Sequence, residues 1–278
     1  MSYFQNRRVF LAGGSEGIGR ETALALARAG AHVVVAARRQ GPLDETVAAL
    51  QAAGAGRFGA VALDVTDRSA VRAAVADVET LLGGAPNVVL TNVGSARPGY
   101  LQDLDDDAFD AMIGVNYHGH VNVIRAFLPG MIAAGGGDIS MVSSALGFMS
   151  MPGYSAYSAS KFAVAGFAQS LRMEVAHHAI RVTLFYPGTT ETPGLASENA
   201  RKPAAVWAME SDSAFSKTHQ PADVAASVLK AIERGRFENF PGFDVWLVWW
   251  MYSRFPRVSR WLADREWASA RAKVAAAE

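Results

Sequence analysis

The sequence predicts an α/β fold built on one doubly wound parallel sheet flanked by helices. Three observations carry this prediction: short apolar runs alternate with longer helical patterns, glycines cluster directly after the first run, and 50% of the 278 residues are hydrophobic. Strands that alternate with helices are typical of right-handed parallel crossovers, which place helices on both faces of a sheet. The length and the hydrophobic content suit a single domain with a sizeable core.

Six buried strands are expected from runs rich in alanine, valine, leucine and isoleucine. These runs cover residues 9–12, 32–36, 60–63, 87–91, 138–143 and 181–186. Helices are expected between them, because apolar residues recur there at helical spacing. The helical patterns cover residues 17–29, 42–53, 68–82, 108–134 and 157–177. Ligands bind at the carboxyl ends of the strands in such a sheet, so functional side chains are expected just after the strands.

The composition changes after residue 188. Residues 188–220 mix Thr, Ser, Pro, Glu and Lys, which is typical of a substrate loop or lid that contains some helix. Pro221 then opens a helix that runs to about Gly235. We therefore divide the chain into a main domain, residues 1–240, and a C-terminal extension, residues 241–278.

Charge and cysteine content exclude several classes of function. Lys plus Arg and Asp plus Glu both number 26, so no global field attracts a nucleic acid, and no nucleic-acid partner is expected. Cysteine is absent, which excludes disulfides, thiolate nucleophiles and the usual zinc cages, and no metal is expected. The first apolar run is too short for a signal peptide. A cytoplasmic location is therefore expected.

A glycine-rich turn follows the first strand. Gly13, Gly17 and Gly19 lie in the stretch AGGSEGIG, which joins that strand to the first helix. Glycines here let the backbone turn tightly and let a pyrophosphate approach the N–H groups and positive dipole of the helix. Ser15 and Ile18 of the same turn are expected cofactor contacts. The alternative is a strand-to-helix turn without a ligand.

The residues after the second strand indicate which cofactor is bound. A carboxylate there would accept the ribose hydroxyls of NAD, but the sequence reads Ala36-Ala37-Arg38-Arg39. Arg38, with or without Arg39, can bind the 2′-phosphate of NADPH through charge-assisted hydrogen bonds, so NADPH is expected. Two solvated arginines are the alternative, and the charge of Glu16 counts against a phosphate nearby.

Two further pairs follow strands and are expected to contact the cofactor. Asp64 and Val65, after the third strand, are placed to touch the adenine. Asn92 and Gly94, after the fourth, are placed to line the bound cofactor. The alternative for either pair is a purely structural role at the end of a strand.

A tyrosine and a lysine lie four residues apart at the start of a predicted helix. Tyr157 and Lys161 therefore share one helix face, about 6 Å apart at Cβ. A free tyrosine has a pKa of about 10, and a nearby cation is expected to lower it, so that the phenol exchanges a proton near neutral pH. Ser144, at the end of the fifth strand, is expected to bond the carbonyl oxygen of a substrate. Ser143 is the alternative by one position.

Together these residues resemble the short-chain dehydrogenase/reductase family over residues 8–194. The positions that match its order and spacing are Gly13, Gly17, Gly19, Asp64, Asn92, Gly94, Asn116, Ser144, Tyr157, Lys161, Pro187 and Gly188. Ala12 and Val93 depart from the usual threonine and alanine. The resemblance implies that residues 1–240 form a Rossmann-type dinucleotide-binding and catalytic domain.

The resemblance also implies roles for individual residues. Asn116 would complete a tetrad with Ser144, Tyr157 and Lys161 by holding a water that connects Lys161 to solvent. Lys161 would also bind the nicotinamide ribose, and Tyr157 would contact the cofactor as well. The segment that begins at Pro187 and Gly188 would lie against the cofactor, with Thr190 or Thr192 contacting the nicotinamide amide.

A narrower resemblance, to the 3-ketodihydrosphingosine reductases of that family, comes from residues 186–194, which read YPGTTETPG, and from residues 154–162. Glu198-Asn199 and Lys202-Pro203 belong to the same pattern. The resemblance implies NADPH-dependent reduction of a long-chain lipid ketone to sphinganine. Two alternatives stay open: the same chemistry on another apolar carbonyl, such as a steroid, a retinoid or a 3-oxoacyl group, and a non-catalytic dinucleotide-binding sensor or scaffold.

The C-terminal extension is rich in tryptophan and arginine. It holds five of the six tryptophans, and Arg254, Arg257 and Arg260 follow its most apolar stretch. That stretch is about ten residues long, whereas a membrane-spanning helix needs roughly 20. Tryptophan beside arginine suits peripheral contact with a membrane surface. A contact between subunits of a homo-oligomer, a dimer or a tetramer, is an equal alternative.

Overall fold

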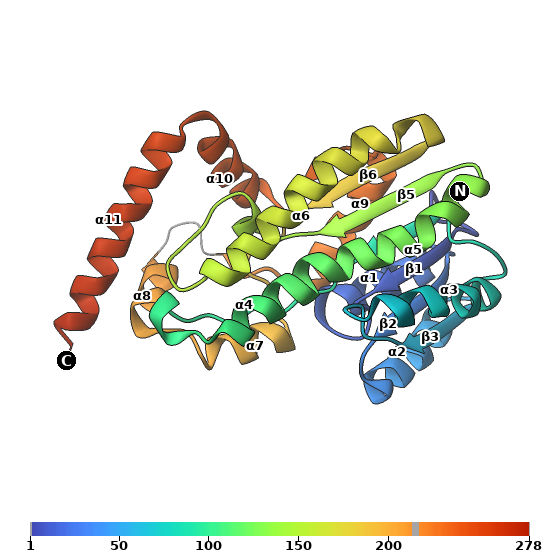
Figure 1. Cartoon of the computed structure of the whole chain (residues 1–278), viewed down its shortest axis with the longest axis horizontal. Coiled ribbons are helices and arrows are strands. Elements are labelled where there is room, and N and C mark those ends of the chain that lie inside the picture. The colour runs from blue at the N-terminus through green and yellow to red at the C-terminus, as the bar shows by residue number, and fades with distance from the viewer. Residues whose placement is uncertain (1, 213–216, 278) are drawn as a thin grey trace.

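The computed structural model describes residues 2–212 and 217–277, and within them one parallel sheet organises the chain. Its seven strands lie in the order β3-β2-β1-β4-β5-β6-β7 (Figure 1). The strands are β1 (Arg8–Ala12), β2 (His32–Ala37), β3 (Phe58–Ala62), β4 (Val88–Thr91), β5 (Gly137–Val142), β6 (Ile180–Phe185) and β7 (Glu238–Asn239). The order reverses between β1 and β4, which confirms the predicted doubly wound, Rossmann-type sheet.

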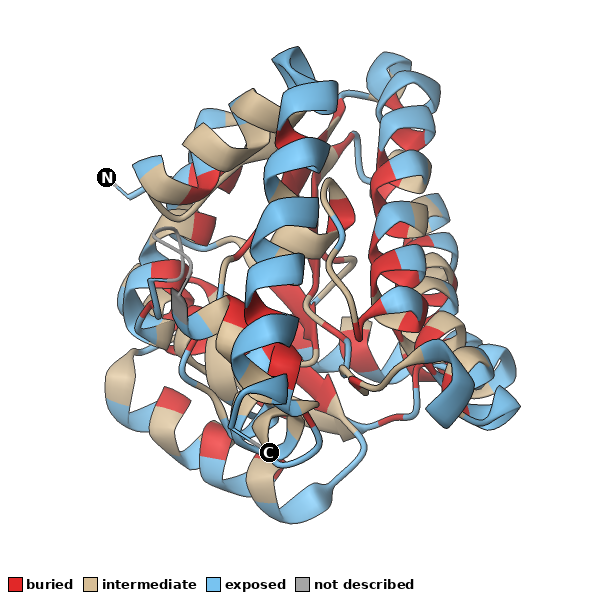
Figure 2. Ribbon diagram, turned by 90° about the vertical axis from the view of Figure 1, so that its left-hand side faces the viewer, coloured by how far each residue is buried: buried red, intermediate tan, exposed pale blue. Residues whose placement is uncertain are grey.

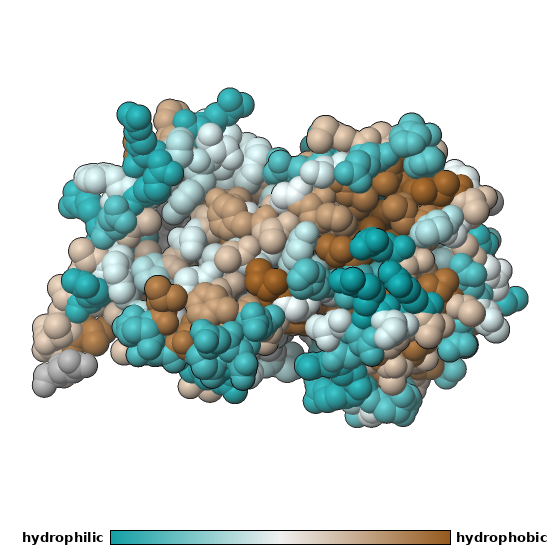
Figure 3. Space-filling model, viewed as in Figure 1, coloured by the Kyte–Doolittle hydropathy of each residue, from teal (hydrophilic) through white to brown (hydrophobic). Residues whose placement is uncertain are grey.

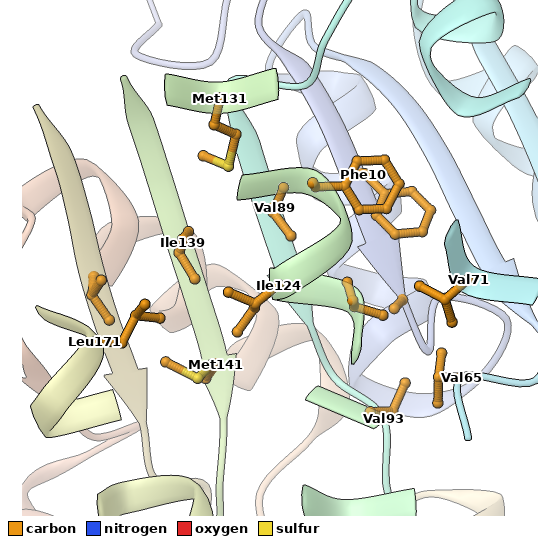
Figure 4. Packing of buried hydrophobic residues seen from close by; sticks show 14 of the residues in the cluster. Phe10, Val65, Val71, Val89, Val93, Ile124, Met131, Ile139, Met141 and Leu171 are labelled. Atoms are coloured by element: carbon orange, nitrogen blue, oxygen red, sulfur yellow. The ribbon is translucent and has the colours of Figure 1, made fainter. Parts of the chain in front are cut away.

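Helices cover both faces of this sheet. One face carries α1 (Gly17–Arg28), α2 (Gln40–Ala53) and α9 (Pro221–Arg234). The other carries α3 (Arg68–Leu82), α5 (Gly119–Ala133) and α6 (Ser155–Glu174), and Figure 4 shows the core on this side. Alternate strand residues point to opposite faces, so Val9 and Leu11 enter the first core whereas Phe10 enters the second.

The element ends differ from prediction by a few residues, and two differences are larger. Strand β7 was not predicted, because two residues are too few to show a pattern. The single helix predicted over residues 108–134 is α4 (Asp106–Ile113) and α5, joined by the π-helical turn η2 (Gly114–His118). Three short 3₁₀ helices complete this part of the chain: η1 (Leu101–Asp103), η3 (Ala145–Gly147) and η4 (Ala176–His178).

The C-terminal half adds helices beyond the carboxyl ends of the strands. They are α7 (Pro193–Asn199), α8 (Ala204–Asp212), α10 (Phe243–Arg254) and α11 (Pro256–Ala275). Helix α11 packs against α8, and both lie with α10 at the end of the molecule away from α2 and β3 (Figure 1). Figure 2 shows α11 in front, with mainly exposed residues toward the viewer. Residues 213–216 of the expected lid lie outside the described residues.

Candidate active site

A cavity of about 1000 Å³ lies at the carboxyl ends of the strands. All but two of the expected site residues line it: Gly13, Ser15, Gly17, Ile18, Arg38, Arg39, Asp64, Val65, Asn92, Gly94, Ser144, Tyr157, Lys161, Pro187, Gly188, Thr190 and Thr192. The two exceptions, Gly19 and Asn116, are buried. The topology therefore brings together residues that are spread over most of the chain.

Three expected catalytic side chains, those of Ser144, Tyr157 and Lys161, line this cavity. Tyr157 and Lys161 lie one turn apart on α6, and the Lys161 Nζ is 5.8 Å from the centre of the Tyr157 ring. The Lys161 ammonium also donates a hydrogen bond to the carbonyl oxygen of Val142, 3.3 Å away. Ser144, which follows β5, is hydrogen-bonded to Tyr157. A carbonyl group can approach the two hydroxyl groups together.

The two adjacent serines have different surroundings. The Ser143 hydroxyl is buried and donates to the backbone oxygen of Lys161 at 3.1 Å, so it ties β5 to α6. The Ser144 Oγ accepts from the Leu146 N–H at 3.1 Å and remains beside Tyr157. This geometry favours Ser144 over Ser143 as the residue that meets a substrate.

Burial sets the protonation of the catalytic pair. It raises the pKa of Tyr157 to about 12, a shift that the hydrogen bond from Ser144 opposes and the charge of Glu198 increases. Burial lowers the pKa of Lys161 to about 8. Lys161 is not among the causes of this shift, so the expected lowering of the Tyr157 pKa by the cation is not seen in this structure, where desolvation of the phenolate dominates. Tyr157 holds its proton at neutral pH, as a proton donor must.

Asn116 lies behind the catalytic pair, in the π-helical turn. Its Oδ1 accepts from the Ser95 N–H at 2.8 Å, and its Nδ2 donates to the Ser95 oxygen at 3.0 Å and to Ser160 Oγ at 2.9 Å. A Cβ added to Gly94 would lie 3.0 Å from Asn116 Oδ1 and 3.2 Å from Lys161 Nζ, so both side chains flank this glycine. The part of Asn116 in a water relay stays a prediction.

The turn before α1 fits a pyrophosphate. Glu16, the residue that precedes α1, makes no side-chain cap bond, so it leaves the N–H groups of the first turn available to an anion. Gly13 has φ +83 and Gly17 has φ +52, conformations that glycine adopts most easily. A Cβ on Gly19 would lie 1.9 Å from the Gly13 oxygen, which explains a glycine at this buried position.

The two arginines after β2 differ in their partners. Arg39 forms an ion pair with Glu16 at 2.5 Å, and both side chains are exposed. Arg38 lines the cavity and is exposed, and it takes part in no ion pair among residues 2–212 and 217–277. The ion pair with Arg39 neutralises Glu16, whose charge counted against a nearby phosphate. Arg38 therefore remains available to bind a phosphate group.

Several other expected contacts also hold the loops of the site. The Asn92 Nδ2 donates to the Gly13 oxygen at 3.3 Å, and Asp64 accepts from the Thr66 hydroxyl at 2.7 Å. Thr190 Oγ1 donates to the Gly188 oxygen at 2.9 Å, and Thr192 Oγ1 accepts from the Leu195 N–H at 3.1 Å. These residues both line the cavity and stabilise its walls.

Sequence reasoning missed the wall that α8, α10 and α11 contribute. Its apolar members include Met209, Val245, Val248, Met251 and Leu262. The sequence did carry a pattern that indicates this wall, because Val245, Val248 and Met251 recur three positions apart and so share one face of α10. The expectation treated residues 241–278 as an extension, whereas α10 and α11 form part of the cavity.

The turn before α1, which fits a pyrophosphate, shares one cavity with Ser144, Tyr157 and Lys161. This combination defines a nicotinamide-dependent oxidoreductase. The family described as short chain dehydrogenase matches residues 7–203, so the chain belongs to that family. A crystal structure described as a short-chain alcohol dehydrogenase from Sinorhizobium meliloti is 27% identical and covers 87% of this chain and 97% of its own, with a TM-score of 0.77. The family binds NAD or NADP through a fold of this kind.

Three curated relatives are similar over most of the chain. A 3-dehydrosphinganine reductase of Arabidopsis thaliana is 35% identical over 94% of this chain and 77% of its own. The 3-ketodihydrosphingosine reductase of Mus musculus is 32% identical over 86% of this chain and 72% of its own. A Mycobacterium tuberculosis protein, whose name gives oxidoreductase without a substrate, is 34% identical over 88% of this chain and 89% of its own.

Proposed function

We propose that the protein uses NADPH to reduce a long-chain ketone, 3-ketodihydrosphingosine, to sphinganine. The observation that carries this proposal is that Ser144, Tyr157 and Lys161 share one cavity with the apolar wall of α10 and α11. The names of two of the three relatives support the same substrate.

Each catalytic side chain has a task that follows from its place. NADPH held against this site would supply the hydride for the carbonyl carbon. Ser144 donates a hydrogen bond that orients the carbonyl oxygen, and Tyr157 gives that oxygen its proton. The Lys161 cation stabilises the phenolate that results, and the pKa of about 8 keeps this cation mostly charged at neutral pH.

The apolar wall suits an alkyl chain. Val245, Val248 and Met251 of α10 and Leu262 of α11 line the same cavity as Tyr157. Each methylene buried there contributes about 0.8 kcal/mol, so a chain of several carbons gains several kcal/mol over a short ketone. This gain is the physical basis for preferring a lipid ketone.

The C-terminal helices also suit contact with a lipid surface, from which such a substrate comes. Exposed aromatic residues, among them Phe243, Trp250 and Trp261, share α10 and α11 with Arg254 and Arg257. Among the described residues, no helix is both long and apolar enough to cross a membrane. We propose peripheral contact at the cytoplasmic face of a membrane.

A different face suits a second subunit. Hydrophobic residues gather over α5 and α6 on the side that Figure 3 shows. Phe162 and Met173 of α6 are exposed, and Leu128 and Ile132 of α5 are partly buried. We propose that this face pairs in a homo-oligomer, which leaves the tryptophan-rich helices free.

The test compares ketones and cofactors with purified protein. We expect NADPH-dependent turnover of 3-ketodihydrosphingosine, with kcat/KM at least about a hundredfold above that of a short-chain amino ketone. Equal rates on the long and short ketones would contradict the lipid assignment. Binding of NADPH without turnover of any carbonyl would support the sensor or scaffold instead.

A further inference from the structure

A partly buried polar cluster borders the catalytic cavity and consists of Tyr154 before α6, Glu198 on α7, Lys202 between α7 and α8, and Glu210 on α8. Tyr154 donates a hydrogen bond to the Glu198 carboxylate, and the Lys202 ammonium is bonded to Glu210. The Lys202 Nζ also lies 3.9 Å from Glu198 Oε1, and its side chain is only 1% exposed. Glu198 and Glu210 line the cavity, whereas Lys202 lies behind them.

The charges of this cluster do not balance. Two carboxylates share one ammonium, which is closer to Glu210 than to Glu198. Burial raises the pKa of Glu198, against which the hydrogen bond from Tyr154 and the charge of Lys202 act. A carboxylate removed from water in this way is stabilised by a further cation, and the 20% of its side chain that is exposed leaves room for one.

Glu198 lies close enough to the reacting group to act on it. Its charge contributes to the raised pKa of Tyr157. Tyr154, which binds Glu198, also contacts Tyr157, with ring centres 6.1 Å apart. A cation bound at Glu198 would therefore sit beside the carbonyl group that Tyr157 protonates.

We propose that Glu198 determines substrate specificity by binding an ammonium group on the carbon next to the reacting carbonyl. The inference rests on the proposed function, because 3-ketodihydrosphingosine carries an amine at that carbon. The class of substrate is then an α-amino ketone with a long alkyl chain. Lys202 keeps Glu210 neutralised, so one carboxylate charge remains for one substrate ammonium.

The bound ammonium would also assist the reaction. It opposes the effect of Glu198 on Tyr157, so the phenol gives up its proton more readily when an amino ketone is bound than when a plain ketone is bound. Recognition and proton transfer are thus coupled through one carboxylate.

The test measures the ratio of kcat/KM for two ketones of equal length, 3-ketodihydrosphingosine and the same ketone with hydrogen in place of the amino group. For the parent we expect a ratio of about ten to a hundred. Glu198→Gln should bring the ratio to within about threefold of one, mainly by raising KM for the amino ketone. Tyr154→Phe, which keeps the carboxylate charge, should retain most of the preference.

A matched control lies outside the cavity. Glu233, exposed near the end of α9, does not line it, so Glu233→Gln should leave the ratio unchanged. Equal losses on both ketones in Glu198→Gln would overturn the amine assignment while the proposed function stands. No turnover of either ketone by the parent would remove the proposed function itself.

A second measurement needs no variant and covers the case in which Glu198→Gln does not fold. A long-chain primary amine and the alcohol of the same length are compared as inhibitors of the parent. We expect the amine to inhibit competitively, at a concentration about tenfold lower than the alcohol. Equal inhibition would overturn the assignment of Glu198 as the ammonium site.

Discussion

The Nζ of Lys161 lies 5.8 Å from the centre of the Tyr157 ring, one turn further along α6, and donates a hydrogen bond to the Val142 oxygen. Both side chains come from one helix, but their protonation depends on their burial within the fold. Burial lowers the pKa of Lys161 to about 8 and raises that of Tyr157 to about 12. At neutral pH the pair is thus an ammonium beside a protonated phenol.

The pH dependence of reduction should follow Lys161. Because its pKa is lowered, the side chain is charged below pH of about 8 and loses its charge as the pH rises through that value. Tyr157 keeps its proton over this range. We expect kcat/KM to fall about tenfold per pH unit above the Lys161 pKa. A rate that stays level up to pH of about 10 would contradict this assignment.

Removing the phenolic hydroxyl should abolish most of the activity. Tyr157→Phe keeps the ring that packs beside Tyr154 but removes the proton donor. We expect turnover to fall by about a hundredfold to ten-thousandfold, while NADPH affinity in a fluorescence titration changes by less than about threefold. Undiminished turnover would exclude Tyr157 as the acid.

The two arginines after β2 should differ in effect. Arg38→Ala should reduce the preference for NADPH over NADH by about tenfold to a hundredfold, because a charge-assisted bond to the 2′-phosphate is lost. Arg39 is already paired with Glu16, so Arg39→Ala should have a smaller effect. The readout is kcat/KM with each dinucleotide. An equal change in both variants would argue against Arg38 as the phosphate ligand.

Gly19, in the first turn of α1, should tolerate no side chain. In Gly19→Ala the new methyl group would meet the backbone oxygen of Gly13, which cannot move aside as a flexible side chain can. We expect a loss of about 1–3 kcal/mol in the free energy of unfolding, together with weaker NADPH binding.

Gly41 supplies the matched control for that substitution. It lies on α2, and a Cβ there meets nothing within 4 Å. Gly41→Ala should leave stability unchanged or raise it by up to about 1 kcal/mol. Urea unfolding measures both variants, and equal stability of the two would show that the Gly13 turn can relax.

Removal of exposed tryptophans should weaken contact with lipid. Trp250 and Trp261 are 38% and 53% exposed on α10 and α11. We expect their replacement by alanine to reduce cosedimentation with phosphatidylcholine–phosphatidylserine vesicles about tenfold. Leu81→Ala, at an exposed position of α3, is the control and should bind vesicles normally. Unchanged binding in the tryptophan variant would contradict the proposed contact with lipid. It would favour the alternative, in which α10 and α11 contact another subunit.

Much of the fold was readable from the sequence because its signals are local. Alternation of apolar runs with helical patterns predicted six of the seven strands, and the glycines after the first run predicted the turn before α1. The break in the helix at residues 114–118 was not readable, since a π-helical turn leaves no mark in the spacing of apolar residues. The packing of α11 against α8 was missed because their contact joins segments far apart in the chain.

The sequence by itself determined the sheet, the glycine-rich turn before α1 and the spacing that puts Tyr157 and Lys161 on one face of α6. Those features depend on neighbours in the chain, so their periodicity reveals them. Only the tertiary structure decided that Ser144 rather than Ser143 meets Tyr157, that burial raises the pKa of the phenol, and that Glu198 lines the same cavity. Desolvation and charge act across space, and the folded chain alone determines which groups share a cavity.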